Sequence, residues 1–480
     1  MDRRQIVLEQ VDVEQMVAAD HPARNIWILL ERLNLTGFDG DVKAVEGHAG
    51  RNLWEPRLLI AIWLYAYSRG ISSARQIERE CAYEPGLRWL TGLKAVNHHT
   101  LSDFRVRHGQ ALQDLFTQVL AMLSMEKLIM LERVTVDGTK VRAAVSKKTF
   151  SRAGKIREHL KVARAHIETL QQEEAEQSQR GRAAAARRRA GQDRVERLEQ
   201  AWAEVERLQS EKKWDRDKPC QASTTDADAQ FMRMSDHGLA PAYNVQVAVD
   251  AEHKLIVDID VSKQPSDAQH LLPALDRIKQ TRNRYPAQVI ADGDYTHRKA
   301  VVGTAERSVD FYGSWRGTGE QEMNNGIAAG YGPEAFRYDE QADRLICPEG
   351  KPLKLKQIQT SDDGLRTHIY AAARRDCSQC PARASCTPQN AMEKHGRAVS
   401  IRHEPAVMET YHAKMATEKG KAIYKQRAPV AEFPHAWMKD KLKWTRLRCR
   451  GLVRVRAEAL WVALTYNLQR YFKLRHLQAA

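Results

Sequence analysis

Long apolar runs are missing from this sequence, and so is the apolar core of a signal peptide, because the chain opens with the charged stretch MDRRQIVLEQ. No segment is therefore expected to span a membrane, and we predict a soluble, cytoplasmic protein. Cysteine is also scarce, with seven residues in 480, an odd number. Without a secretion signal, this scarcity argues against a disulfide framework and indicates a reducing compartment.

Positive charge is abundant. Lys and Arg number 76 against 61 Asp and Glu, which leaves a formal net charge of +15 and a pI near 9.4. Such a balance favours a polyanionic partner, so we expect association with nucleic acid and, within the cytoplasm, with the nucleoid. At 480 residues, the chain is long enough for two or three hydrophobic cores.

Residues 1–130 show helical periodicity throughout and form the first predicted domain, which is all-α. The stretch NHHTLSDFRVRH offers Thr100 or Ser102 as the cap of a helix that carries Arg105 and Arg107. Short helices joined by tight turns, the last of them basic, suit a DNA-binding domain in which Arg105 and Arg107 contact DNA. A helical bundle used for dimerisation is the alternative.

Residues 151–222 are predicted to form a helical-hairpin insert. Apolar residues recur at heptad spacing in two stretches, and the polar, basic stretch RGRAAAARRRAGQ lies between them. Two antiparallel, coiled-coil-like helices with a basic tip account for this pattern. The tip is either a phosphate contact or a solvated loop without a task.

Residues 131–150, 223–320 and 420–480 are predicted to form the core, a mixed sheet flanked by helices. The run VTVDGTKVRA alternates β-branched and polar residues, which places Asp137 in the middle of a strand. A later, short apolar strand runs into Asp292, at the carboxyl end of a strand, where ligands usually bind. Taken alone, Asp137 suits either a hairpin turn, because Asp-Gly is a turn signal, or a divalent metal.

Residues 321–419 form a predicted Cys-rich insert. Cys347, Cys377, Cys380 and Cys386 follow the spacing C-x29-C-x2-C-x5-C. Four thiolates within reach of one another suit a tetrahedral, structural Zn²⁺ site. The spacing differs from the usual paired knuckles, so reduced, unligated thiols are the alternative.

The C-terminal part of the core contains a helix whose start is limited by Pro434. Because Pro434 has no N–H, the helix is expected to begin only a few residues before it, with Glu432 in or beside the first turn. Lys439 follows Glu432 by about two turns and lies on the same helix face, so we expect both side chains to face one cleft. Tyr424 and Arg427 are predicted to lie on a non-helical segment that leads into this helix and ends at Pro429.

Three acids, Asp137, Asp292 and Glu432, are thus predicted on a strand, at a strand end and at a helix start. If the sheet brings them together, the carboxylates repel one another, and divalent cations are needed to keep all three ionised. Two such cations support phosphodiester chemistry, because they activate the attacking oxygen and stabilise the leaving one. The predicted chemistry is therefore metal-dependent cleavage of nucleic acid.

These motifs resemble those of the DDE-type transposases of bacterial insertion sequences, in the group with a Tyr-Arg-Glu-Lys signature. Tyr424, Arg427, Glu432 and Lys439 match that signature as Y-x2-R-x4-E-x6-K, with an Arg-to-Glu gap one residue longer than in its commonest form. The resemblance also includes the stretches VDGTKVRA, PAYNVQVAVD and ADGDY and the cysteine segment, and so extends over most of the chain.

The resemblance implies a ribonuclease-H-like α/β core and a DNA transposase that cuts element ends and transfers strands into target DNA. It implies Mg²⁺ or Mn²⁺ held by Asp137, Asp292 and Glu432, double-stranded DNA as the partner, and a homodimer in the active complex. Tyr424, Arg427 and Lys439 are predicted DNA contacts, which position phosphates rather than bind metal. The alternatives are a metal-dependent nuclease without strand transfer and a non-catalytic, zinc-containing DNA-binding regulator.

Overall fold

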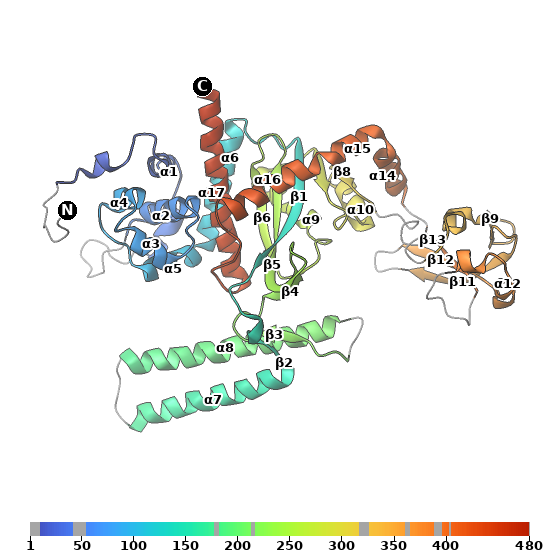
Figure 1. Cartoon of the computed structure of the whole chain (residues 1–480), viewed down its shortest axis with the longest axis horizontal. Helices are drawn as coiled ribbons and strands as arrows, with labels where there is room; N and C mark the ends of the chain where they lie inside the picture. Colours follow the sequence, from blue (N-terminus) through green and yellow to red (C-terminus); the bar gives the residue numbers. More distant parts are fainter. Residues whose placement is uncertain are drawn as a thin grey trace, which may run out of the picture. The chain divides into compact units, whose positions relative to one another are not determined.

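The computed structural model describes residues 10–41, 54–176, 182–212, 217–315, 326–360, 365–387, 396–402 and 405–479 (Figure 1). The chain forms both helices and β-sheets, so the predicted mixed α/β class is confirmed. It divides into two units, Met1–Ala287 with Ala428–Ala480, and Gln288–Arg427. This division differs from the four predicted domains, whose boundaries stay predictions. Among the described helices, none is long and apolar enough to cross a membrane.

Helices occupy the N-terminal part of the first unit, as predicted. They are η1 (Val13–Met16), α1 (Pro22–Leu30), η2 (Thr36–Asp41), α2 (Pro56–Ser68), α3 (Ala74–Glu80), α4 (Pro85–Thr91), α5 (His98–Arg107) and α6 (Gly109–Met125). The α2 helix is apolar and almost entirely buried, so the other helices must enclose it. The Asn97 side chain caps α5 by accepting a hydrogen bond from the His99 N–H at 2.8 Å. The predicted caps Thr100 and Ser102 are wrong, because both residues lie inside α5.

β-Branched residues form the strand predicted around Asp137. The sheet of the first unit contains β1 (Arg133–Arg142), β4 (Gln230–Arg233), β5 (Leu239–Asp250) and β6 (Ile256–Ser262). The other three strands all pair antiparallel with β5, and the register sets Asp137 opposite Val247. The helices α9 (Leu271–Arg282) and α17 (Leu452–Ala479) pack against β6, and α17 also packs against α2 and α6. The sheet and the N-terminal helices therefore share a core.

The helical-hairpin insert contains α7 (Ala153–Glu176) and α8 (Arg182–Glu211), which lie side by side (Figure 1). At its base, η3 (Lys147–Thr149) leads into β2 (Phe150–Arg152), which pairs with β3 (Gln221–Ser223). Ile156, Leu160, Leu198 and Val205 belong to one buried cluster, as the heptad spacing predicts. Residues 182–190 of the predicted basic tip lie in the first turns of α8 rather than in a loop, residues 177–181 are outside the described residues, and a role for the tip stays a prediction.

The second unit contains a parallel strand pair and a small antiparallel sheet. β7 (Gln288–Ala291) and β8 (Asp310–Gly313) are parallel and are joined by α10 (Arg298–Glu306), while α14 (Ala406–Ala416) and α15 (Glu418–Lys425) pack against β8. The remaining elements are η4 (Ala329–Tyr331), η5 (Pro333–Ala335), β9 (Arg337–Asp339), β10 (Arg344–Ile346), β11 (Pro352–Thr360), β12 (Arg366–Ala372), α12 (Arg374–Ser378), α13 (Arg383–Cys386) and β13 (Ala398–Arg402). The small sheet has the strand order β13-β12-β11-β10-β9.

The helix that carries Glu432, α16 (Arg427–Asp440), begins earlier than predicted. Pro429 is its third residue, where a missing N–H costs no intrahelical hydrogen bond. Pro434 lies inside the helix and is buried, so apolar packing offsets the one hydrogen bond that it removes. The prediction of a helix start beside Glu432 is therefore wrong. The predicted non-helical approach is wrong as well, since Tyr424 lies in α15 and Arg427 opens α16.

A buried carboxylate on α17 fixes the chain between α16 and α17. Glu458 is fully buried and accepts hydrogen bonds from Trp444 Nε1 at 3.1 Å and from the backbone N–H groups of Arg448 at 2.9 Å and Cys449 at 2.8 Å. Since every one of these partners is a donor, only a side chain with two acceptor oxygens satisfies them all. The Trp444 side chain and the backbone at Arg448 and Cys449 are thus tied to one group on α17.

We expect Glu458→Gln to lower the free energy of unfolding by about 3 kcal/mol, because an amide N–H₂ then faces buried donors that lose their acceptor. Urea unfolding followed by tryptophan fluorescence measures the loss. Glu418→Gln is the matched control, since the Glu418 side chain is 92% exposed, and it should change stability by less than about 0.5 kcal/mol. Equal stability of the two variants would show that Glu458 does not hold this segment.

Candidate active site and cysteine cluster

Asp137 lies in the middle of β1, in a strand rather than in a hairpin turn. Its side chain is 18% exposed, and its Oδ1 accepts a hydrogen bond from the Gly138 N–H at 2.9 Å. His435 of α16 places its Nδ1 3.8 Å from Asp137 Oδ2. A partly buried carboxylate thus meets a nitrogen side chain from another element of the same unit.

One face of α16 is turned toward Asp137. Glu432, His435 and Lys439 follow one another at spacings of three and four residues, which puts them on the same face of a helix. Burial lowers the pKa of Lys439, and the nearby Asp137 carboxylate opposes that shift. Because His435 and Lys439 both lie near Asp137, Glu432 belongs to the helix face that is turned toward the same carboxylate.

Asp292 follows β7 directly, at the carboxyl end of that strand, as predicted. Its Oδ1 accepts a hydrogen bond from the Asp294 N–H at 2.9 Å, and its backbone carbonyl accepts one from the Thr296 hydroxyl at 2.9 Å. Asp292 therefore organises the turn after β7. Since it belongs to the second unit, whereas Asp137 and Glu432 belong to the first, the convergence of the three acids stays a prediction.

Tyr424 lies on α15 and packs on an apolar cluster that contains Ile290 of β7, Tyr312 of β8 and Ile423. This packing attaches α15 to the strand that ends at Asp292. Arg427, the first residue of α16, is partly buried. The roles of Tyr424 and Arg427 as DNA contacts stay predictions.

Arg105 and Arg107 differ in accessibility, although both lie on α5. Arg105 is 8% exposed, its guanidinium lies 4.7 Å from the ring centroid of Trp63, and its Nη1 donates to the Ser72 carbonyl at 2.9 Å. The prediction that Arg105 contacts DNA is wrong, because these contacts hold its charge inside the unit. The Arg107 side chain is 58% exposed and pairs with Asp103 at 3.1 Å, so its role as a DNA contact stays a prediction.

The four cysteines of the Cys-rich segment line one cavity of about 30 Å³ beside the core of the small sheet. Backbone N–H groups donate to two of the sulfurs, from Lys351 to Cys347 Sγ at 3.2 Å and from Arg397 to Cys377 Sγ at 3.4 Å. Burial raises the pKa of Cys386 to about 11; Arg397 opposes the rise, and the other three cysteines add to it. The four thiols are therefore close together, as the sequence spacing predicts.

The donor atoms near Asp137 and those of the cysteine cluster suit different metals. Carboxylate oxygens such as those of Asp137 and Glu432 are the ligands that Mg²⁺ and Mn²⁺ prefer, and thiolates are those that Zn²⁺ prefers. Within the described ranges, no three or more His, Cys, Asp or Glu side chains are already arranged to hold an ion. Binding of an ion by the four cysteines, or by Asp137 and Glu432, therefore requires these side chains to rotate.

His435 is absent from the predicted site, although the sequence contains a signal for it. It follows Glu432 by three residues and precedes Lys439 by four, which is the spacing of one helix face. The prediction assigns roles on this helix face to Glu432 and Lys439 and gives none to His435, which lies between them. The continuous α16 puts it in the middle of the face.

Two protein families match parts of the chain. A family described as transposase DDE domain matches residues 346–472, a range that includes Glu432 and Lys439. A family described as transposase domain (DUF772) matches residues 11–107, which are the N-terminal helices. Both matches support a DDE-type DNA transposase, an enzyme that acts on DNA. Asp137 and Asp292 lie outside both matched ranges.

Among solved structures, the chain is similar to one titled "Cryo-EM structure of piggyBac transposase synaptic complex with hairpin DNA (SNHP)". The identity is 8%, the match covers 92% of this chain and 71% of the other, and the TM-score is 0.36. This similarity is too low to indicate a shared fold. No curated protein sequence matches the chain.

Proposed function

We propose that this protein is a DNA transposase with a ribonuclease-H-like core, which cuts DNA at the ends of its element and joins those ends to target DNA. Asp137, Asp292 and Glu432 are its metal-binding, catalytic carboxylates. The observation that carries this proposal is the approach of α16 to β1, where His435 Nδ1 lies 3.8 Å from Asp137 Oδ2 and Glu432 shares the helix face of His435. The matches to two transposase families support it.

A pair of Mg²⁺ or Mn²⁺ ions, when bound, supplies activation of the attacking oxygen and stabilisation of the leaving oxygen. The chain's own task is to hold the carboxylates ionised and fixed. Asp137 is fixed by its place in a paired strand, and the nitrogens of His435 and Lys439 reduce the cost of its partly buried charge. Glu432 is fixed by its place inside α16 rather than at a frayed helix end.

Lys439, Arg427 and Tyr424 are proposed to position phosphates of the DNA. A charged Lys or Arg cannot be a metal ligand, and each is a usual contact for a phosphate. Lys439 lies on the face of α16 that also carries Glu432, so its ammonium group is directed toward the place where a scissile phosphate would lie. These residues orient the substrate and take no part in bond breaking.

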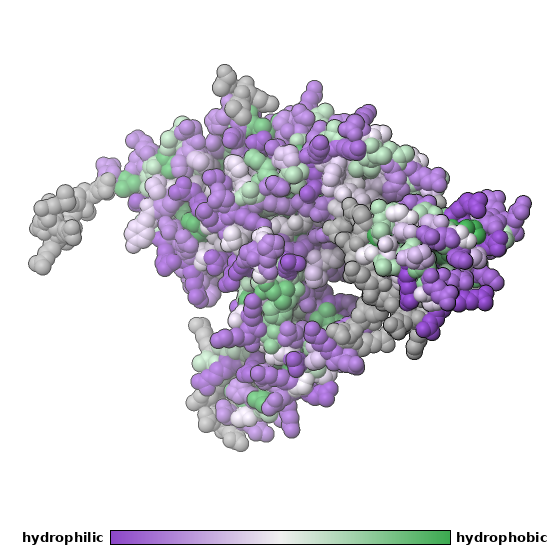
Figure 2. All heavy atoms as spheres, turned by 45° about the vertical axis from the view of Figure 1, so that its right-hand side comes forward, coloured by the Kyte–Doolittle hydropathy of each residue, from purple (hydrophilic) through white to green (hydrophobic). Residues whose placement is uncertain are grey.

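The proposed partner is double-stranded DNA, both element ends and target, and two copies of the chain are proposed to act together. A net charge of +15 attracts a polyanion, and hydrophilic side chains cover most of the face in Figure 2. A cytoplasmic, nucleoid-associated location follows from this partner. DNA binding alone is also expected of a non-catalytic, DNA-binding regulator. An assay of DNA cleavage and joining is therefore needed to distinguish the two functions.

Strand transfer separates the proposal from its two alternatives. We expect the protein with Mg²⁺ to convert a labelled duplex of the element's terminal repeat and a supercoiled target plasmid into labelled, joined products, resolved on an agarose gel. A nuclease gives cut duplex without joined product, and a regulator leaves both DNAs intact. Joining must also disappear without divalent metal, because the proposed chemistry depends on it.

We also propose that Cys347, Cys377, Cys380 and Cys386 bind one structural Zn²⁺. The specific observation is the single small cavity that all four thiols line, with backbone N–H groups donating to two of the sulfurs. A zinc ion there would cross-link β10, α12 and α13 beside the core of the small sheet, which contains few large apolar residues. Its role would be to stabilise this part of the chain, and no catalytic step passes through it.

A further inference from the structure

The segment between α16 and α17 alternates between buried and exposed residues. Apolar side chains at Leu442, Trp444, Leu447 and Cys449 are buried. Five of the exposed side chains between and beside them are basic, and we call these five the basic ridge: Lys441, Lys443, Arg446, Arg448 and Arg450. All five of these basic side chains are exposed to solvent on this short segment.

The chain that carries the basic ridge is tied to neighbouring elements by several hydrogen bonds. Glu458 accepts hydrogen bonds from Trp444 and from the backbone of Arg448 and Cys449, as described above. Leu447 donates its N–H to the Arg142 carbonyl at 2.8 Å, which ties the segment to the end of β1. Little backbone freedom is left for a ligand to remove on binding, which favours binding.

The basic ridge also touches the N-terminal helices. Arg448 Nε donates to Ser72 Oγ at 3.2 Å, in the loop between α2 and α3. In the same loop, Gly70 has a φ of +75°, and a Cβ there would lie 2.9 Å from Cγ of Lys443. The positive φ and this close approach both require glycine. The ridge is therefore continuous with two parts of the first unit, the strand that carries Asp137 and the helices that carry Arg107.

No acid interrupts the basic ridge along the chain; just after it, Asp226 and Asp228 accept hydrogen bonds from the backbone N–H groups of Gly451 and Leu452. From Lys441 to Ala457 the sequence contains basic residues and no Asp or Glu. The adjoining Asp440 lies 3.4 Å from Lys441 Nζ and 3.7 Å from Lys443 Nζ, with all three side chains at least 64% exposed. Exposed ion pairs of this kind contribute at most about 1 kcal/mol, so a phosphate can displace Asp440.

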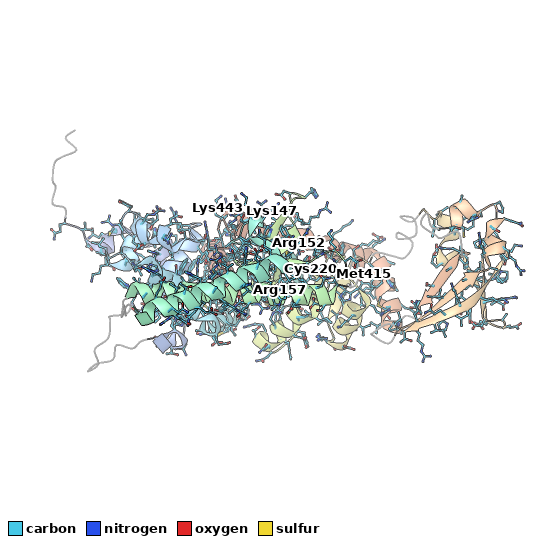
Figure 3. The ribbon with its side chains drawn as sticks, turned by 90° about the horizontal axis from the view of Figure 1, so that it is seen from below. Lys147, Arg152, Arg157, Cys220, Met415 and Lys443 are labelled. Atoms are coloured by element: carbon cyan, nitrogen blue, oxygen red, sulfur yellow. The ribbon has the colours of Figure 1, made fainter. Side chains whose placement is uncertain are left out.

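The positive surface extends past the ridge toward the hairpin insert. Arg450 Nε donates to the Ala144 carbonyl at 3.0 Å, and the exposed Lys147 and Lys148 follow a few residues later. Lys147 and Lys443 are both labelled in Figure 3, near the upper edge of the view. Exposed basic residues therefore continue beyond the basic ridge, at Lys147 and Lys148.

We propose that the basic ridge binds the phosphate backbone of duplex DNA next to the site of cleavage, independently of base sequence. This inference rests on the proposed function for the identity of the polyanion. A membrane surface fits less well, because the apolar residues of the segment face inward and none is left to enter a lipid layer. Exposed cations on a segment whose own apolar side chains are buried match what a run of phosphates requires.

The test is the salt dependence of binding to a duplex of unrelated sequence, in buffer without divalent metal. We expect the triple variant Arg446→Ala, Arg448→Ala and Arg450→Ala to bind at least about tenfold more weakly at physiological salt. The slope of log K against log salt should fall by about 2 to 3, since each lost phosphate contact removes about 0.9. The double variant Lys441→Gln and Lys443→Gln, which changes only exposed side chains, should lower the slope by about 1 to 2.

The matched control is the triple variant Lys155→Ala, Lys161→Ala and Arg164→Ala, which removes the same charge from exposed positions on α7. Its slope and affinity should stay close to those of the unchanged protein. The ridge proposal is overturned if the ridge variants bind like the unchanged protein, or if the control loses as much as they do. If the ridge variants lose binding but the unchanged protein joins no ends to a target, the ridge stands and the transposase proposal fails.

Discussion

Changing Glu432 to Gln should abolish DNA cleavage while leaving DNA binding within about twofold of normal. A neutral amide keeps the size and helix position of Glu432 but removes the charge that the metal requires, and a loss of metal-ligand charge should cost at least about 10³-fold in rate. The measurement is cleavage of a labelled terminal-repeat duplex with Mg²⁺, beside a gel-shift titration of the same duplex. Asp137→Asn and Asp292→Asn should give the same pattern.

Two variants on the same helix control this prediction. Asp440→Asn removes an acid from the end of α16, where the side chain is 67% exposed, and should leave cleavage unchanged. Lys439→Ala should do the reverse of Glu432→Gln, because it weakens DNA binding and lowers the salt slope by about 0.9 while Mn²⁺ binding, measured by calorimetry, persists. Near-normal cleavage by Glu432→Gln, or loss of Mn²⁺ binding in Lys439→Ala, would mean that the third acid lies elsewhere.

Changing Cys380 to Ser should remove zinc from the protein and unfold the small sheet β9 to β13. Four-thiolate zinc sites contribute on the order of 10 kcal/mol at neutral pH, far more than the few apolar residues of this sheet can replace. Elemental analysis of the purified full chain should give about one zinc per chain, and close to none for the variant. Limited proteolysis should then cut the variant within residues 326–402 and leave the first unit intact.

Cys220→Ser is the matched control for this experiment. Cys220 is a free cysteine of the first unit, just before β3, and outside the cavity that the other four line. It should retain full zinc content and the normal pattern of proteolysis. Absence of zinc from the unchanged protein, together with equal proteolysis of both variants, would leave the four cysteines as reduced thiols.

Local patterns predict most of the elements. The alternation in VTVDGTKVRA gives β1, and the apolar run before Asp292 gives β7. Heptad spacing gives α7 and α8 in the same way. These predictions hold because strand and helix periods depend on neighbouring residues, which a single sequence displays.

The start of α16 could not be predicted from local rules. A proline inside a helix removes a hydrogen bond, so the sequence favours a start close to Pro434. Burial of Pro434 and Val430 offsets that cost, and burial depends on distant elements. The helix therefore begins at Arg427, and this shift brings His435 into the site.

The sequence also could not predict which arginine side chains of α5 are exposed to solvent. Arg105 and Arg107 lie two residues apart on α5, but Trp63 of α2 and the Ser72 carbonyl enclose only Arg105. The basic residues of the ridge appear in the sequence as one more charged run, and the contacts of their segment with Glu458 on α17 and with the end of β1 are tertiary.

The sequence by itself determined the mixed α/β class, the positions of three acids on strand, strand end and helix, the cysteine spacing and the excess of positive charge. Each of these depends on composition or on residues close together in the chain. The tertiary structure decided which charges face solvent, that α16 brings His435 and Lys439 close to Asp137, and that four cysteines share one cavity. Those features arise from packing between segments far apart in the chain, and no local pattern encodes the contacts that such packing creates.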